Sequence, residues 1–228
     1  MNLQKIAFVF AFIFISTAVH SQSRDSRKLI SFDRIKVFGN INVTLQEGTK
    51  EKAEIRVRGL STEKVITYVS QGLLKVKLQD GNFKDVNIDV LITYRELREI
   101  TASASAYIQS KSIIKGDKLE VGAGSAGNIV LKVDLNAIDI TADTGARIDI
   151  SGSTKRQNSK VTLGAQLDAS KLDCNEAFVK SNTGGQIFLR ANKHIDAVAA
   201  TGAQILYRGN PEYRNVKSSL GGEVIHRH

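Results

Sequence analysis

Gly145-Ala-Arg-Ile148 is one of six related tetrapeptides in this chain. The others are Ser105-Ala-Tyr-Ile108, Ala126-Gly-Asn-Ile129, Gly164-Ala-Gln-Leu167, Gly184-Gly-Gln-Ile187 and Gly202-Ala-Gln-Ile205. The aliphatic residue that ends each copy recurs at intervals of 21, 19, 19, 20 and 18 residues. A repeat with this period is typical of a β-solenoid, in which each turn of chain stacks on the turn below. The sequence therefore predicts an all-β, right-handed parallel β-helix with coils of about 18 to 21 residues.

The alternation of strands assigns a direction to each position of the repeat. If the aliphatic anchor points inward, the residues two before and two after it also point inward. The glycine three residues before the anchor is expected at a corner with positive φ, at Gly145, Gly164, Gly184 and Gly202. Two columns should face solvent on consecutive coils. The first holds Val130, Asp149, Asp168, Phe188 and Leu206, and the second holds Lys132, Ser151, Ser170, Arg190 and Arg208.

The rest of the chain divides around this repeat. Residues 32–98 alternate apolar and polar residues between turn signals and are expected to form an N-terminal β-strand region. Residues 61–70 allow two interpretations: a short helix capped by Ser61 and running through Tyr68, or a strand, which their β-branched and aromatic residues favour. The solenoid coils are predicted over residues 99–210. The polar residues 22–31 are expected to be a flexible leader, and residues 211–228 to fold back as a cap over the last coil.

The first 21 residues have the pattern of an export signal, with Lys5 before an apolar stretch that is too short to span a bilayer. We expect no transmembrane segment after its removal. The net charge of +9 favours anionic polysaccharide, envelope lipid or an acidic protein as a partner, and it serves solubility equally well. Cys174 is the single cysteine, so no intrachain disulfide can form.

The sequence resembles a known family. The opening Phe32-Asp-Arg-Ile-Lys-Val-Phe-Gly-Asn-Ile-Asn-Val-Thr-Leu45, the Gly-Ala-Gln coils and the ending Leu206-Tyr-Arg-Gly-Asn-Pro211 are similar to the putative auto-transporter adhesin head domain, called the GIN domain. The resemblance extends over essentially all of the chain after residue 21. It implies a β-helical protein exported from bacteria of the Bacteroides type, and it implies no catalytic residues.

Two apparent enzyme motifs are explained better by structure. Gly122-Ala-Gly-Ser-Ala-Gly127 has dinucleotide-binding spacing, but the residues after it predict strand where that site requires a helix. Ser112-Ile-Ile-Lys115 has the spacing of an acylating serine and lysine without the further elements of that chemistry. We therefore expect no catalytic residue, no cofactor and no metal site as the main interpretation.

Five outward residues are the candidate ligand-binding set: Lys132, Asp149, Asp168, Arg190 and Arg208. Asp149 and Asp168 should lie one strand spacing apart, where they could hold Ca²⁺, or they could be solvated carboxylates neutralised by Lys155, Arg156 or Lys171. Arg190 and Arg208 should lie side by side, where an anion would relieve their repulsion. Otherwise both side chains extend into water.

Phe188 and Leu206 form an outward apolar pair, which we expect to be covered by residues 213–224 or by a partner chain in an oligomer. The resulting functional prediction is a non-enzymatic, exported interaction module in the periplasm, on the outer surface or secreted. The alternatives are a β-helical polysaccharide lyase or hydrolase and a structural envelope protein. No nucleic-acid partner is expected.

Overall fold

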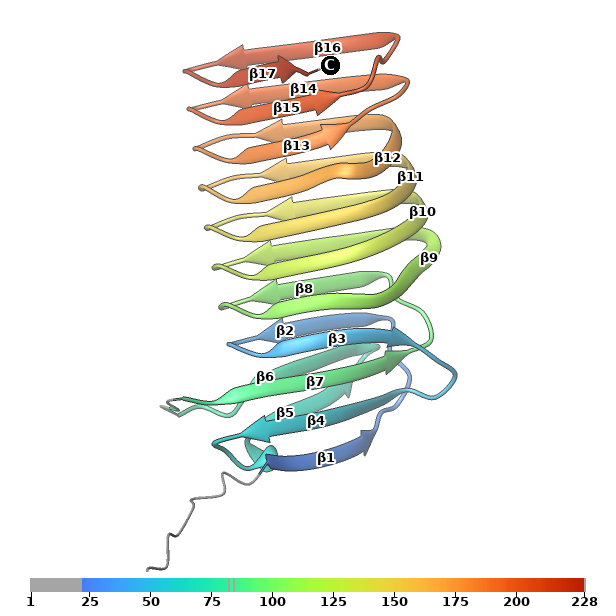
Figure 1. Ribbon diagram of the computed structural model, residues 1–228, viewed down its shortest axis with the longest axis vertical. Coiled ribbons are helices and arrows are strands. Elements are labelled where there is room, and N and C mark those ends of the chain that lie inside the picture. Colours follow the sequence, from blue (N-terminus) through green and yellow to red (C-terminus); the bar gives the residue numbers. More distant parts are fainter. Residues whose placement is uncertain (1–21, 82, 84, 228) are drawn as a thin grey trace, which may run out of the picture.

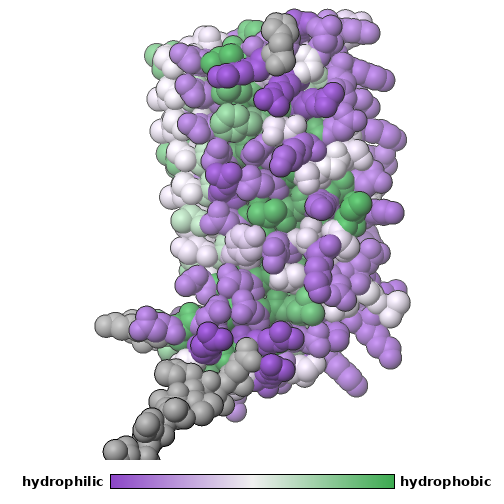
Figure 2. Space-filling model, viewed as in Figure 1, coloured by the Kyte–Doolittle hydropathy of each residue, from purple (hydrophilic) through white to green (hydrophobic). Residues whose placement is uncertain are grey.

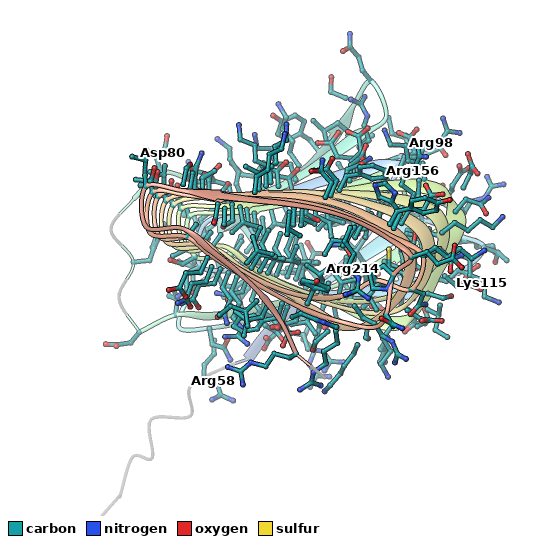
Figure 3. The ribbon with its side chains drawn as sticks, turned by 90° about the horizontal axis from the view of Figure 1, so that it is seen from above. Arg58, Asp80, Arg98, Lys115, Arg156 and Arg214 are labelled. Atoms are coloured by element: carbon teal, nitrogen blue, oxygen red, sulfur yellow. The ribbon has the colours of Figure 1, made fainter. Side chains whose placement is uncertain are left out.

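The computed structural model describes residues 22–227 except residues 82 and 84, so the expected export signal lies outside the described residues. The strands form one continuous sheet that is wound into stacked coils (Figure 1). The predicted parallel β-solenoid is thereby confirmed. Viewed along the stack, each coil is flattened, with two long faces joined by a rounded edge and a narrow tip (Figure 3).

The N-terminal strands are short. They are β1 (Gln22–Lys28), β2 (Arg34–Phe38), β3 (Asn42–Glu47), β4 (Lys52–Arg58), β5 (Val65–Ser70), β6 (Leu73–Leu78), β7 (Asn87–Tyr94) and β8 (Glu99–Ser103). A single 3₁₀ turn, η1 (Thr62–Lys64), is capped by Ser61 and leads into β5. The prediction of strand over residues 61–70 is thus confirmed for residues 65–70.

The longer strands bend around the rounded edge and contribute to both faces. These are β9 (Tyr107–Gly124), β10 (Asn128–Ala142), β11 (Arg147–Val161) and β12 (Gln166–Ser181). Later coils are divided into separate strands: β13 (Gln186–Arg190), β14 (His194–Ala200), β15 (Gln204–Arg208), β16 (Tyr213–Ser219) and β17 (Glu223–His226).

The aliphatic anchors stack in register along the solenoid. Ile129 pairs with Ile108 below and Ile148 above, and the ladder continues through Leu167, Ile187 and Ile205. All six anchors are fully buried. Burying one such side chain contributes about 1.5 to 3 kcal/mol, so the repeat is the main source of the core. The residues two before and two after each anchor are buried too, as alternation predicts, except Ser110, which is half-buried.

From β8 onward, each coil turns its tip through two consecutive residues with left-handed backbone conformation. Gly145, Gly164, Gly184 and Gly202 have φ of 69°, 69°, 72° and 69°, and the residue before each has φ near 50°. The predicted corner is confirmed. Each corner N–H donates to the next coil, for example from Gly164 to the carbonyl of Thr183 at 3.0 Å. The tips are therefore stacked by hydrogen bonds like the strands between them.

The N-terminal coils do not follow chain order. The coil of β2 and β3 lies between β6 and β7 on one side and β8 and β9 on the other. After β1 at the lower end, the chain enters the stack with β2 and β3, builds the lower coils with β4 to β7, and then passes to the other side of the β2–β3 coil (Figure 1).

The lower end is closed by residues that were expected to be flexible. Residues 22–28 form β1, which pairs antiparallel with β4, so the prediction of a flexible leader is wrong for them. The Arg27 guanidinium donates to the carbonyls of Val65 at 2.6 Å and Thr62 at 2.9 Å. It also contacts Asp25 at 2.7 Å. These bonds satisfy polar backbone groups at the open end of the core.

The upper end also differs from the prediction, because the C-terminal segment does not fold back. Instead β16 pairs with β14 and β17 pairs with β15, both parallel, as one more coil. Arg214 lies in register with the buried Ile195 and therefore points into the space that the coil encloses (Figure 3). Its Nε donates to the carbonyl of Pro211 at 2.9 Å. A coil whose inner residues are partly polar can end the stack without a separate cap.

The corner geometry gives a stability prediction. Gly164→Val should lower the free energy of unfolding by about 1 to 3 kcal/mol because a β-branched residue is strained at positive φ. A Cβ at Gly164 would meet no atom within 4 Å, so backbone strain is the main cause. Thr162→Val, at the same tip but with ordinary φ, should change stability by less than about 0.5 kcal/mol. Equal denaturant midpoints for the two variants would contradict the corner assignment.

Candidate functional site

The outward columns lie on the face formed by β13, β15, β17 and the first halves of β10 to β12. We call this the anchor face; it lies in front in Figure 1. Val130, Asp149, Asp168, Phe188 and Leu206 are register partners on successive coils, as predicted. The space-filling view from the same side shows hydrophilic residues over most of this surface, with hydrophobic patches between them (Figure 2).

The second column is interrupted by a bulge. Asp149 pairs with Asp168, but Ser151 pairs with Lys171, so β12 contains one extra residue between them. Ser170 donates both its N–H, at 3.0 Å, and its hydroxyl, at 2.6 Å, to Asp168 Oδ1. Ser170 was expected to lie beside Ser151 in the second column. Because of the bulge, Lys171 lies there instead.

Two hollows on the anchor face bring together most of the candidate residues. One, of about 390 Å³, is lined by Lys132, Asp149 and Asp168 together with Arg147 and Lys171. The other, of about 300 Å³, is lined by Asp168, Phe188, Leu206, Arg208 and Arg227, with three further residues. Asp168 belongs to both, so the hollows adjoin. Arg190 lines neither but is the register partner of Arg208.

Asp149 and Asp168 have different partners. Arg147 Nε contacts Asp149 Oδ2 at 3.1 Å and its Nη2 contacts Oδ1 at 3.3 Å, so the ion pair is bidentate. The hydrogen bond and the charge of Asp149 raise the pKa of Arg147, and the charge of Asp168 contributes to the same effect. Of the expected counterions, Arg156 pairs with Glu176 instead. The described residues include no cluster of three or more His, Cys, Asp or Glu that could hold a metal ion.

Arg190 and Arg208 stand side by side, as predicted, and both are exposed. Neither forms an ion pair with any residue in the described part of the chain, and Arg227 adds a third guanidinium at the second hollow. The Asp149 charge at the other end of the face is already neutralised by Arg147. The last coils of the anchor face therefore carry three guanidinium groups without an ion pair in the described structure.

Phe188 and Leu206 are half-buried rather than covered. Leu206 pairs with Phe188 below and with Ile225 above, so three large apolar side chains follow one another along the column. The prediction that residues 213–224 cover the pair is wrong, because these residues continue the stack. Cover by a partner chain stays a prediction.

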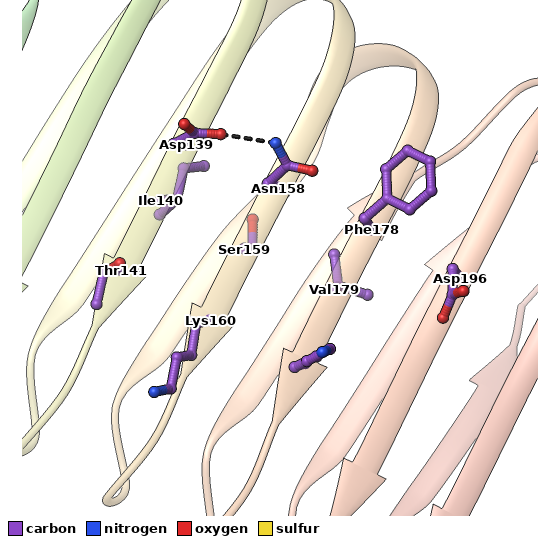
Figure 4. A pocket seen from close by; sticks show the side chains of 10 residues that line it. Asp139, Ile140, Thr141, Asn158, Ser159, Lys160, Phe178, Val179 and Asp196 are labelled. Atoms are coloured by element: carbon purple, nitrogen blue, oxygen red, sulfur yellow. Dashed lines mark hydrogen bonds between the residues drawn. The ribbon is translucent and has the colours of Figure 1, made fainter.

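The opposite face, which we call the back face, contains β2, β6, β8, β14, β16 and the second halves of β9 to β12. A hollow of about 480 Å³ lies on it. Asp139 accepts a hydrogen bond from Asn158 at 2.7 Å, and Phe178 follows on the next coil (Figure 4). Lys160 and Lys180 also line it. Arg156 lies 5.3 Å and His194 5.1 Å from the centre of the Phe178 ring.

Sequence reasoning missed Arg147 and the back face, and it named Lys171 only as a counterion and not as a member of the second column. Arg147 precedes Asp149 by two residues, so alternation alone places both on one face and could have paired them. Lys171 reaches the anchor face only because of the bulge, for which the interval of 20 residues between Leu167 and Ile187 was the available signal. The glycine motif at residues 122–127 runs into β10 without a helix, so the structural interpretation is confirmed.

Both faces carry their charged groups on a rigid stack of parallel coils, which defines the protein as a β-solenoid that displays ladders of side chains. The family model described as "Putative auto-transporter adhesin, head GIN domain" matches residues 31–211. The chain belongs to this family, and the family description is that of an adhesin rather than an enzyme.

Solved structures share the fold. A "putative adhesin" from Bacteroides fragilis has a TM-score of 0.83 at 17% identity, covering 91% of this chain and 97% of its own. A "putative lipid binding protein" from Parabacteroides distasonis has a TM-score of 0.73 at 18% identity, with coverage of 91% and 97%. A "putative adhesin" from Parabacteroides merdae has a TM-score of 0.72 at 18% identity, covering 91% of this chain and 96% of its own. The comparison with curated proteins gave no match. In the described residues no helix is long and apolar enough to cross a membrane.

Cys174 belongs to the core and not to either face. It is fully buried in register with Thr154, and burial raises its pKa to about 12. Since the thiolate is the reactive form, Cys174 should be inert in the folded protein. An Ellman-type reagent at pH 8 should modify it only in denaturant. Rapid modification of the native protein would contradict the packing described.

Burial of this thiol also implies a pH dependence. The unfolded thiol ionises near its ordinary pKa of 9.0 and the folded one near 12, so its stabilising contribution is complete below pH 9 and declines between these values. The free energy of unfolding of the wild type should therefore fall more steeply from pH 8 to pH 10 than that of Cys174→Ala. Parallel curves for the two proteins would show that the thiol ionises equally in both states.

Proposed function

We propose that this protein is a non-enzymatic, exported interaction module of the bacterial envelope that binds an anionic glycan across the last coils of its anchor face. The observation that carries the proposal is the register pair Arg190 and Arg208, which has no carboxylate partner in the described structure. Like charges directly opposite each other are destabilising by up to about 1 kcal/mol. A bound anion removes this repulsion.

The neighbouring hollow suits one unit of an acidic sugar. Arg208 and Arg227 offer planar, forked donors that match a carboxylate. Phe188 and Leu206 supply an apolar surface for the C–H groups of a ring, and Asp168 supplies an acceptor for hydroxyl groups. Positive charge, apolar surface and an acceptor thus occur within about 300 Å³.

The family description supports an adhesive role and an exported protein. Residues 1–21 have the pattern of an export signal, which supports a mature chain in the periplasm, on the outer surface or outside the cell. The name of the Parabacteroides distasonis neighbour raises a lipid ligand as the competing source of an anionic group. The test below includes both sources.

The test compares wild type with the Arg190→Ala, Arg208→Ala double variant. Wild type should bind polygalacturonate but not neutral dextran, and affinity should fall as salt rises because exposed charges are screened. The double variant should bind on the order of tenfold more weakly, which corresponds to about 1.4 kcal/mol. Isothermal titration calorimetry measures both.

The matched control is Lys111→Ala, Lys115→Ala, which removes the same charge from β9, away from the hollow. Its affinity should remain within about twofold of wild type. Equal binding by all three proteins, or binding by none, would remove the arginine pair as the site. Preferential binding to vesicles containing phosphatidic acid would assign the site to a lipid phosphate instead.

A further inference from the structure

The back face carries a second charged column that sequence reasoning did not consider. From the lower end upward its register partners are Tyr68, Lys75, Lys36, Thr101, Gly122, Thr141, Lys160, Lys180, Val198 and Lys217. We call this the lysine column. It contains five lysines and no carboxylate, and two pairs of lysines are direct register neighbours.

These lysines have no counterions in the described structure. None of the five forms an ion pair with a described residue, and Lys75 alone has a contact of another kind, 5.5 Å from the centre of the Tyr68 ring. The pairs Lys36 with Lys75 and Lys160 with Lys180 therefore leave like charges facing each other one strand spacing apart.

The acids in the adjacent column form no ion pair with any of the five lysines, and each accepts from another donor. Glu120 contacts Lys118 at 3.1 Å, and Asp139 contacts Lys118 at 2.7 Å and Asn158 at 2.7 Å. Glu99 accepts from Thr101 at 3.2 Å, and Asp196 accepts from Asn215 at 3.0 Å. On the other side of the lysine column, Asp143 lies beside Gly124. It is therefore next to Gly122 and Thr141, the uncharged middle of the lysine column.

Aromatic side chains accompany both lysine pairs. Phe38, 55% exposed, follows Lys36 by two residues on the same face of β2, and Tyr68 is the register partner of Lys75. At the upper pair, Phe178 lines the hollow together with Lys160 and Lys180. Cationic groups beside exposed rings fit a polymer that has both anionic groups and C–H surfaces, which is an acidic polysaccharide rather than a bare phosphate.

The spacing of the pairs defines the length of the ligand. Lys36 and Lys160 are separated by four strand spacings, or about 19 Å at ~4.8 Å each. A ligand that reaches both pairs must be extended along the solenoid axis. We propose that the lysine column binds a linear acidic polysaccharide lying parallel to this axis, at a surface separate from the arginine pair on the anchor face.

Two-point binding makes the affinity depend on chain length. Oligogalacturonates too short to span about 19 Å engage one lysine pair, whereas longer ones engage both and gain from the high effective concentration of the second contact. Affinity for the long oligomers should exceed that for the short ones by at least tenfold. Two double variants test this, one at each lysine pair. The difference should be abolished both by Lys160→Gln, Lys180→Gln and by Lys36→Gln, Lys75→Gln.

The controls separate this surface from the arginine site. Lys111→Gln, Lys115→Gln removes the same charge outside the column and should keep the length dependence. Arg190→Ala, Arg208→Ala should keep it too, so the two proposals can fail independently. The proposal is overturned by length-independent affinity, by equal losses in the lysine control, or by duplex DNA of equal length binding as tightly as the long glycan.

Discussion

The in-register stacking of an aliphatic anchor on every coil is the interaction on which the rest of this structure depends. Ile129 lies between Ile108 and Ile148, and all three are fully buried. The left-handed corners at Gly164 and its equivalents let the chain reverse at the same point on each coil. Together they hold successive coils at the same phase, so residues at equivalent positions of different coils form straight outward columns.

These columns determine which charged side chains become neighbours on the surface. On a surface built this way, an isolated charge on one coil becomes part of a row when the next coil repeats it. Arg190 and Arg208 on the anchor face and Lys160 and Lys180 on the back face are such repeats, and neither pair is neutralised within the described structure. Asp149, in contrast, is neutralised by Arg147 on its own strand. We propose that the uncompensated pairs belong to binding surfaces and the compensated charges to the scaffold.

The repeat allowed much of this to be predicted from sequence, because stacking converts a one-dimensional period into contacts. The anchor register, the corner glycines and the adjacency of Arg190 and Arg208 all follow from it. The parts that could not be predicted depend on pairing between segments with no shared period. Residues 22–28 look polar and unstructured, yet they complete the lower end because β4 offers a free edge and Arg27 reaches backbone carbonyls. The bulge at Ser170 moves Lys171 into the column, and a one-residue change of this kind is invisible to alternation.

The most direct test of the central claim, that outward columns of uncompensated charge are the binding surfaces, is a crystal structure of the protein with an acidic oligosaccharide. The account predicts sugar carboxylates within hydrogen-bonding distance of Arg190 and Arg208, or of the lysines at 160 and 180, with the sugar chain crossing several coils. An oligosaccharide bound only at the tips or the rounded edge, away from both columns, would contradict it.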